Sequence, residues 1–197
     1  MASVRKKKIR QPRQKRLPQV LTHNQVLLLL AAIHSPVQRG CFSLMYACGL
    51  RINEVRPLEV SSIDGQKQLL RIIGKGNKER LIPLPTSTLY GLRSLWREHR
   101  HPRFLFPNKG GTNAVHSCVL YRTFKDALRE AGLPSEITPH VLRHSYATRL
   151  MENDVDLRTT QILMGHSSIK STLIYSHLTE PTRKKLRSTL DTIMADL

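Results

Sequence analysis

Residues 67–84, KQLLRIIGKGNKERLIPL, carry the clearest β-strand pattern in the sequence. Two aliphatic runs, 67–73 and 79–84, flank the stretch Gly74-Lys75-Gly76-Asn77-Lys78. Aliphatic runs joined by a short Gly- and Asn-rich connection predict an antiparallel β-hairpin. The sequence on both sides of it has helical periodicity. We therefore predict a mainly α fold with a small antiparallel β-sheet, an α+β domain.

Two helices are predicted before the hairpin. Thr22 is followed three residues later by Gln25, which is a capping-box pattern, and the helix that it starts should cover 23–34 and stop before Pro36. A second helix should cover 37–48 and be closed by Gly49, a residue that favours the left-handed conformation at a helix end.

After the hairpin, the pattern predicts helices over 87–99, 114–131, 139–152, 157–164, 169–177 and 181–194. Thr138 before Pro139 suggests a side-chain cap followed by a proline in the first turn. We divide the chain into a basic tail (1–20), one domain (21–178) and a C-terminal helix (179–197) that we expect to pack on a neighbouring protomer.

The charge of the chain points to a polyanionic partner. Lys and Arg number 32 against 14 Asp and Glu, for a net charge of +18, and no acidic residue precedes Glu54. Nucleic acid is the favoured partner, although charge alone leaves a ribosomal-type RNA binder or an anionic-membrane binder open. The tail is either a phosphate-contacting arm or a solubilising or localisation segment; its basic residues are Arg5, Lys6, Lys7, Lys8, Arg10, Arg13, Lys15 and Arg16.

Cysteine usage and hydropathy indicate the compartment. The three cysteines, Cys41, Cys48 and Cys118, have no metal-binding spacing, and the first two fall in an apolar helical stretch as small core residues. The first ten residues lack the apolar core of a signal peptide, and the longest apolar run, 26–33, is too short to span a bilayer. We expect a cytoplasmic protein without a membrane partner.

Polar side chains occur at several places where a core would favour apolar ones. Each has an ordinary explanation by itself, as a surface charge, a solvated turn lysine or a packed tyrosine. The six that we single out are Arg51, Lys75, His140, Arg143, His166 and Tyr175. His140 and Arg143 are three residues apart on one predicted helix, so they share a face.

These six residues, two Arg, two His, one Lys and one Tyr, match one reaction, phosphodiester transfer without a metal. Fixed arginines can meet the negative charge that develops on the phosphate, while the reaction also needs an oxygen nucleophile and a proton donor for the leaving oxygen. Zinc at His140 and His144 is the competing interpretation, but the HExxH glutamate is missing and Arg143 would oppose a cation. We predict no metal and no cofactor.

Five strings make the chain recognisable as a whole. In order and with ordinary spacing, they resemble the catalytic domain of the tyrosine recombinase (phage integrase) family over about residues 20–178: Cys48-Gly-Leu-Arg-Ile-Asn-Glu54, Gly74-Lys-Gly-Asn-Lys-Glu-Arg80, Thr138-Pro-His-Val-Leu-Arg-His144, Leu163-Met-Gly-His166 and Tyr175-Ser-His177. The resemblance is to bacterial chromosome-dimer resolvases and to integron or phage integrases, rather than to eukaryotic type IB topoisomerases.

The resemblance implies a role for each matching position. Arg51 and Arg143 would clamp the scissile phosphate, and Lys75 would protonate the leaving 5′-oxygen. His140 would assist proton removal from the nucleophile, His166 would donate to the phosphate, and Tyr175 would attack it to form a 3′-phosphotyrosyl link. Glu54, His144 and His177 are interpreted as structural supports. The implied partners are double-stranded DNA in the bacterial nucleoid and further copies of the chain, in a tetrameric synapse.

One departure from the family concerns the N-terminus. Family members usually carry an N-terminal helical DNA-binding domain, whereas this sequence starts at what resembles the linker between domains, Arg5 to Pro18. An excised fragment, a truncated gene and a naturally short recombinase are all consistent with that start. A catalytically idle DNA-binding or regulatory remnant is the alternative to an active enzyme.

Overall fold

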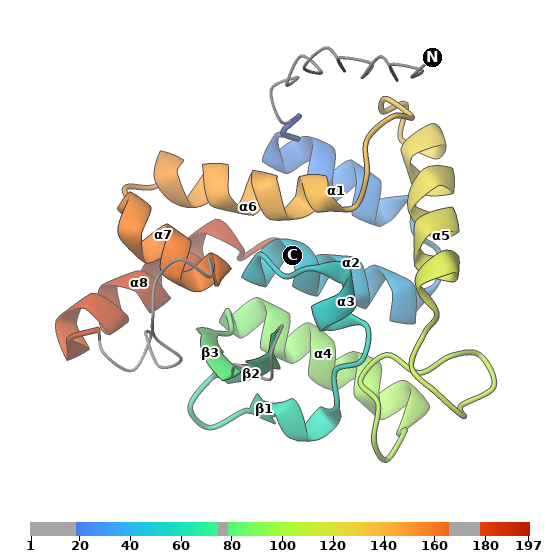
Figure 1. Cartoon of the computed structure of the whole chain (residues 1–197), viewed down its shortest axis with the longest axis horizontal. Coiled ribbons are helices and arrows are strands. Elements are labelled where there is room, and N and C mark those ends of the chain that lie inside the picture. Colours follow the sequence, from blue (N-terminus) through green and yellow to red (C-terminus); the bar gives the residue numbers. More distant parts are fainter. Residues whose placement is uncertain (1–18, 75–78, 166–177) are drawn as a thin grey trace, which may run out of the picture.

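Helix α2 (Pro36–Cys48) lies at the centre of the molecule (Figure 1). Helix α6 (His140–Glu152) packs along one side of it and α4 (Thr86–His99) along the other. The last eight residues of α2 are nearly all buried, including Phe42 and Tyr46, so α2 forms the middle of the core. Cys41 and Cys48 are buried there, as predicted from the apolar stretch.

The computed structural model describes residues 19–74, 79–165 and 178–197. The predicted site residues Lys75, His166 and Tyr175, the basic tail and the helix expected over 169–177 fall outside these ranges. Within the described ranges, no helix has both the length and the apolar character needed to cross a lipid bilayer.

The remaining helices surround α2. In Figure 1, α1 and α5 lie toward the upper right, α7 and α8 lie toward the left, and the short α3 follows α2 directly; their bounds are α1 (His23–Ala31), α3 (Ile52–Val55), α5 (Ser117–Glu130), α7 (Leu157–Met164) and α8 (Glu180–Ile193). The capping box at the start of α1 is confirmed: the Thr22 N–H donates to Gln25 Oε1 at 2.9 Å, and the Gln25 N–H donates to Thr22 Oγ1 at 3.3 Å.

The sheet is antiparallel and small, in the order β1 (Ile63–Asp64), β2 (Leu69–Ile73) and β3 (Glu79–Pro83). The hairpin of β2 and β3 confirms the prediction, with Ile72 opposite Arg80 and Leu70 opposite Ile82. Strand β1 follows the 3₁₀ turn Val60–Ser62, and its two residues were too few to be predicted from sequence periodicity. The fold class, mainly α with a small antiparallel sheet, is confirmed.

The start of α6 differs from the prediction. The helix begins at His140, its N-cap is Pro139, and the expected Thr138 side-chain cap is absent from the described contacts. Pro139 stands at the N-cap with helical dihedral angles and has no side-chain oxygen to cap the helix, so the helix begins one residue later than the expected start at 139. Thr138 contributes its carbonyl instead, which accepts from the Val141 N–H at 2.9 Å.

Helix α8 packs on its own chain. Its buried residues, Leu186, Leu190 and Ile193, belong to the common core. The Arg149 side chain of α6 donates to the Ile193 carbonyl at 2.7 Å, which ties the end of α8 to the body of the domain. The apolar face of α8 is therefore covered within the chain, and packing on a neighbouring protomer stays a prediction.

Candidate active site

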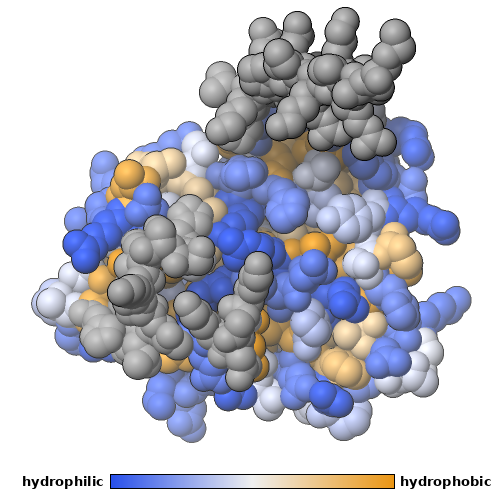
Figure 2. All heavy atoms as spheres, viewed as in Figure 1, coloured by the Kyte–Doolittle hydropathy of each residue, from blue (hydrophilic) through white to orange (hydrophobic). Residues whose placement is uncertain are grey.

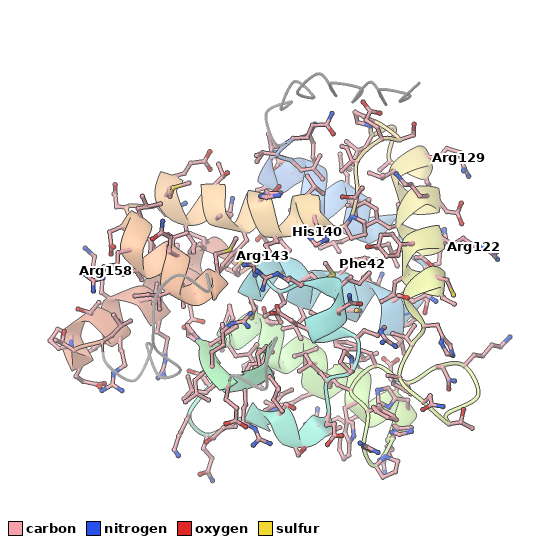
Figure 3. All side chains as sticks on the ribbon, in the orientation of Figure 1. Phe42, Arg122, Arg129, His140, Arg143 and Arg158 are labelled. Atoms are coloured by element: carbon pink, nitrogen blue, oxygen red, sulfur yellow. The ribbon has the colours of Figure 1, made fainter. Side chains whose placement is uncertain are left out.

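Arg143 is a buried cation at the centre of the face shown in Figure 3. Its side chain extends from α6 toward the junction of α2 and α3 and is only 5% exposed. One terminal nitrogen donates to the Gly49 carbonyl and the other to the Met164 carbonyl. These two carbonyls end α2 and α7. Helix C-termini leave carbonyls without partners and favour positive charge, so both helix ends suit a guanidinium. The surface around this region is strongly hydrophilic (Figure 2).

Glycine closes both of these helices, and both glycines adopt the left-handed conformation. Gly49 has φ of +61° and Gly165 has φ of +64°. A Cβ on Gly49 would stand 2.3 Å from a ring carbon of Tyr146, which is too close for any side chain. Glycine is therefore required there both for its dihedral angles and for the space, and it brings the Gly49 carbonyl within reach of Arg143.

Burial and neighbouring cations act on the charge of Arg143. Burial first, and then the charge of Arg51, lower the pKa of Arg143 to about 10, while Glu54 acts in the opposite direction. A guanidinium with that pKa is still fully charged at neutral pH. The site therefore holds a desolvated cation, two of whose five N–H donors are used by carbonyls within the described residues.

Arg51 lies at the N-terminus of α3, two residues after Gly49. Its backbone N–H donates to Glu54 Oε2 at 2.9 Å, and its Nη1 donates to Glu54 Oε1 at 3.0 Å. The Arg51 side chain is 43% exposed, whereas that of Glu54 is only 9% exposed. Arg51 thus presents much of its guanidinium to solvent while one end is fixed by a buried carboxylate.

A third arginine, Arg80 of β3, completes the group. It donates through Nη1 and Nη2 to the two oxygens of Glu54, each at 3.0 Å. Burial raises the pKa of Glu54, but the hydrogen bonds and charges of Arg80 and then Arg51 outweigh burial and hold this pKa below its ordinary value. We call Arg51, Arg80, Arg143 and Glu54 the arginine cluster. Counting three cations and one anion, it carries a net charge of +2.

His140 and His144 lie on α6, His140 about one turn before Arg143 and His144 directly after it, and both are exposed. Burial lowers the pKa of His144, and the charges of His140 and Arg143 lower it further. Neutral imidazole is therefore favoured beside the cluster. No group of three His, Cys, Asp or Glu side chains within residues 19–74, 79–165 and 178–197 is arranged to hold a metal ion.

The structure brings together some of the predicted site residues. Arg51 and Arg143 meet where α2 passes into α3, and His140 lies on the same helix as Arg143. Lys75, His166 and Tyr175 are outside the described residues. The residues bordering them can be placed: a Cβ on Gly165, the residue before His166, would lie 2.9 Å from Arg80 Nε. The segments that carry Lys75 and His166 therefore both adjoin residues at the arginine cluster, Arg80 for the first and Gly165 for the second.

Arg80 and the two carbonyl partners of Arg143 were not predicted as parts of the site. Arg80 ends the string Gly74–Arg80, but a charged residue on a small hairpin is most often a solvated one. Its partner Glu54 is 26 residues away in sequence, so no local spacing could connect them. The available signal was Glu54 itself, the first acidic residue in a strongly basic chain.

The chain matches known proteins over nearly its whole length. Residues 19–181 match the phage integrase family. Similar proteins include tyrosine recombinase XerD of Lacticaseibacillus casei, 40% identical over 71% of this chain, and XerD of Proteus mirabilis, 37% identical over 87% of it. XerC of Chlamydia muridarum is 37% identical over 90% of the chain. The chain belongs to the phage integrase family.

Solved structures have the same fold. The integrase of mycobacterium phage Brujita is 26% identical over 92% of the chain, with a TM-score of 0.73. XerH site-specific recombinase bound to its difH substrate is 27% identical over 93%, with a TM-score of 0.68. The alignments cover 50%, 59% and 60% of the three XerD and XerC proteins and 60% and 57% of these two solved chains, so the chain spans little more than half of its relatives.

Proposed function

We propose that the chain is the catalytic part of a tyrosine-type site-specific DNA recombinase, which cuts and rejoins DNA strands without a metal. The observation that carries the proposal is the arginine cluster in a member of the phage integrase family. Arg143 is held rigid and desolvated, and Arg51 is held with its guanidinium partly exposed beside it. Two fixed guanidinium groups suit the two nonbridging oxygens of a phosphate.

In the proposed reaction, the Tyr175 hydroxyl oxygen attacks phosphorus and the bond from phosphorus to the 5′-oxygen breaks. The tyrosine proton passes toward His140, and Lys75 gives a proton to the leaving 5′-oxygen. Arg51, Arg143 and His166 stabilise the negative charge on the phosphate. The product is a 3′-phosphotyrosyl link and a free 5′-hydroxyl, and the reverse reaction rejoins the strand.

The burial of the other tyrosines supports Tyr175 as the nucleophile. Tyr46 is 1% exposed and Tyr146 is fully buried, so neither can reach a phosphate. Burial also raises the pKa of Tyr46 to about 12 and raises that of Tyr146, which opposes formation of the phenolate. Tyr90 and Tyr121 are exposed, on α4 and α5, and they serve as internal controls.

The proposal is tested by trapping the covalent intermediate. Wild-type protein incubated with nicked suicide DNA should form an adduct that survives denaturant, is removed by protease, maps to the Tyr175 peptide and persists in EDTA. Tyr175→Phe should bind DNA normally and form no adduct, because it lacks only the nucleophilic oxygen. An adduct on Tyr90 or Tyr121, or a strict requirement for Mg²⁺, would refute the mechanism. DNA binding without any adduct would favour the idle remnant.

We propose double-stranded DNA as the partner. The net charge of +18 supports this, and the similar XerH recombinase was solved bound to its DNA substrate. The tail residues from Arg5 to Arg16 would add phosphate contacts. A variant lacking residues 1–17 should then show weaker binding and a shallower fall of log affinity with log salt, by about 0.9 per lost contact. An unchanged slope would exclude the tail from the phosphate contacts.

The proposed assembly and location follow from the same function. Copies of the chain would associate on paired DNA sites as a tetramer, and the protein would act in the bacterial cytoplasm at the nucleoid. The relatives support the bacterial setting, because they include proteins of Lacticaseibacillus casei and Proteus mirabilis.

A further inference from the structure

Glu54 is the single acidic member of the arginine cluster, and all four of its hydrogen bonds in the described structure come from two arginines. Oε1 accepts from Arg51 Nη1 and Arg80 Nη1, and Oε2 accepts from the Arg51 backbone N–H and Arg80 Nη2. The four distances lie between 2.9 and 3.0 Å. The carboxylate thereby fixes both the backbone and the side chain of Arg51.

The two arginines use Glu54 differently. Arg80 makes a bidentate pair, with both terminal nitrogens on the carboxylate, and its side chain is 16% exposed. Within the described residues, Arg51 gives one terminal nitrogen to Glu54, and its side chain is 43% exposed. Because a bidentate pair fixes both oxygens in one plane, Arg80 determines the orientation in which Glu54 meets Arg51.

Arg80 also sets the charge that Arg51 can offer. A carboxylate that is 9% exposed needs a cation, and Arg80 supplies one. Without Arg80, Glu54 would still accept from Arg51, and the other arginine of the cluster is Arg143, whose pKa already responds to Glu54. Glu54 would then draw the donors of Arg51 toward itself and away from a phosphate. The net charge of the cluster would fall from +2 to +1.

The position of Arg80 connects three segments of the site. It lies on β3, two residues after Lys78, and it pairs with Glu54 of α3. On its other side it lies against Gly165, since a Cβ there would come within 2.9 Å of Nε and 3.0 Å of Cδ and Cζ. A side chain at position 165 would require Arg80 to shift, and the positive φ there also favours glycine.

We propose that Arg80 is a positioning residue of the phosphate clamp and acts through Glu54 on Arg51. Arg80 touches no reacting atom in this scheme. It holds the Glu54 carboxylate in place and offsets its negative charge, so that Glu54 offsets the charge of Arg51 less and the remaining donors of Arg51 can serve the nonbridging oxygens. The inference rests on the proposed function, because the clamp it serves is that of the strand-cleavage reaction.

The test compares two substrates in single-turnover cleavage at saturating protein. One nicked DNA has an ordinary scissile phosphate, and the other has a methylphosphonate, which lacks the nonbridging negative charge and depends less on an arginine. Arg80→Met should slow adduct formation on the phosphate by about 10–100-fold and on the methylphosphonate by about threefold or less. Arg80→Lys should lie between, because it keeps the charge and loses the bidentate geometry.

A double-mutant cycle separates action through Arg51 from a general effect. In an Arg51→Ala background, Arg80→Met should cost about threefold or less, since its effect is already lost. The matched control is Arg71→Met on the neighbouring strand, where Arg71 pairs with exposed Glu79 at 3.5 Å; it should leave both rates unchanged. If Arg80→Met slowed adduct formation equally on both substrates, or if its effect on the rate were fully additive with that of Arg51→Ala, Arg80 would have only a structural role. Either result would overturn the proposal.

A binding measurement separates this inference from the proposed function. In the Tyr175→Phe background, the ratio of affinities for phosphate and methylphosphonate DNA reports the clamp without any chemistry. Arg80→Met and Arg80→Lys should both reduce that ratio. Suppose that the wild type formed no adduct but the Arg80 variants still reduced this affinity ratio. Strand cleavage would then be wrong as the function, while the effect of Arg80 on phosphate binding would be confirmed. A ratio unaffected by either Arg80 variant would overturn it.

Discussion

Arg143 and Arg51 lie in the same cluster but are held by different means. Arg143 is 5% exposed and is fixed by two main-chain carbonyls, at Gly49 and Met164. Arg51 has a side chain that is 43% exposed and is fixed by a carboxylate, which is fixed in turn by Arg80. One arginine is part of the packed core, and the other depends on a network of charges.

The difference has consequences for how each arginine responds to change. Carbonyl partners carry no net charge, so Arg143 keeps its full charge and responds mainly to packing. The partner of Arg51 is ionisable, so its position responds to substitutions and to acid. Helix packing and charge pairing therefore hold the two halves of the proposed phosphate clamp independently, and substitutions can separate them.

The largest expected effects come from removing either arginine. Arg143→Ala and Arg51→Ala should each reduce adduct formation by about 10²–10³-fold, because each removes a fixed donor to the phosphate. Only Arg143→Ala should also lower the free energy of unfolding substantially, by about 2 kcal/mol, since it leaves two carbonyls at helix ends without partners. Arg51→Ala should cost about 0.5 kcal/mol. Urea denaturation measures both, and equal losses would contradict the distinction.

The next effect concerns the glycine that brings a carbonyl to Arg143. Gly49→Ala should lower the free energy of unfolding by about 3 kcal/mol, because it adds a clash with Tyr146 to an unfavourable positive φ. Gly132→Ala is the matched control, with φ of +66° and open space where the added methyl would stand, and it should cost about 1 kcal/mol. Thermal or urea unfolding would show the difference; similar losses would mean that the close approach to Tyr146 is unimportant.

A smaller effect should appear in acid for the charge network of Arg51. The pKa of Glu54 is lower in the folded protein than its ordinary value of about 4.3, so the folded state binds this proton less readily than the unfolded chain. The stability that ionised Glu54 contributes is fully present above about pH 4.3 and is lost as the pH falls through the lowered pKa.

Glu54→Gln should therefore be less stable than wild type near pH 7, and the two should converge below about pH 4.3. Urea denaturation from about pH 3 to 7 measures this difference. Glu79→Gln, which removes the exposed partner of Arg71, is the control and should run parallel to wild type. A constant difference between Glu54→Gln and wild type at all pH values would exclude the ionic contribution.

The smallest expected effect is on His144. Its pKa is lowered by burial, by the charge of His140 and by the charge of Arg143, which directly precedes it on α6. Imidazole signals in NMR should therefore show His144 titrating below about 6.5. Arg143→Met and His140→Gln should each raise the His144 pKa, and Arg51→Ala should leave it in place. A comparable shift in Arg51→Ala would show that both arginines act on α6 equally.

Much of the local structure could be predicted from short stretches of sequence. The capping box of Thr22 and Gln25, the glycine end of α2 and the hairpin around residues 74–78 depend on neighbours in the chain, and the structure confirms them outside residues 75–78. The predicted Thr138 cap was wrong because the helix starts at His140 and leaves Pro139 at the N-cap, which composition alone does not reveal. The two-residue strand β1 is too short to show a period.

The candidate site could be predicted in part. Arg51, His140 and Arg143 were singled out as residue types suited to phosphate chemistry, and the structure places Arg51 and Arg143 together where α2 meets α3. Arg80 was not predicted as part of the site, because an arginine on a strand indicates a site only when its partner in the folded structure is known. The sequence offered the acid, Glu54, but no rule of spacing that would join it to the hairpin.

The sequence by itself determined which side chains could do chemistry, where the helices and the hairpin lie, and that the chain carries a large positive charge. Tertiary structure decided how Arg143 and Arg80 are held, whereas Arg51 is held by Glu54 only three residues away. Arg143 reaches carbonyls 94 and 21 residues away, and Arg80 reaches Glu54 across 26 residues. Helix ends leave carbonyls open to any suitable donor, and a buried carboxylate accepts any nearby cation. The packing of α6 against α2 brings Arg143 to these carbonyls, and the position of β3 beside α3 brings Arg80 to Glu54. Neither contact can be predicted from the local sequence.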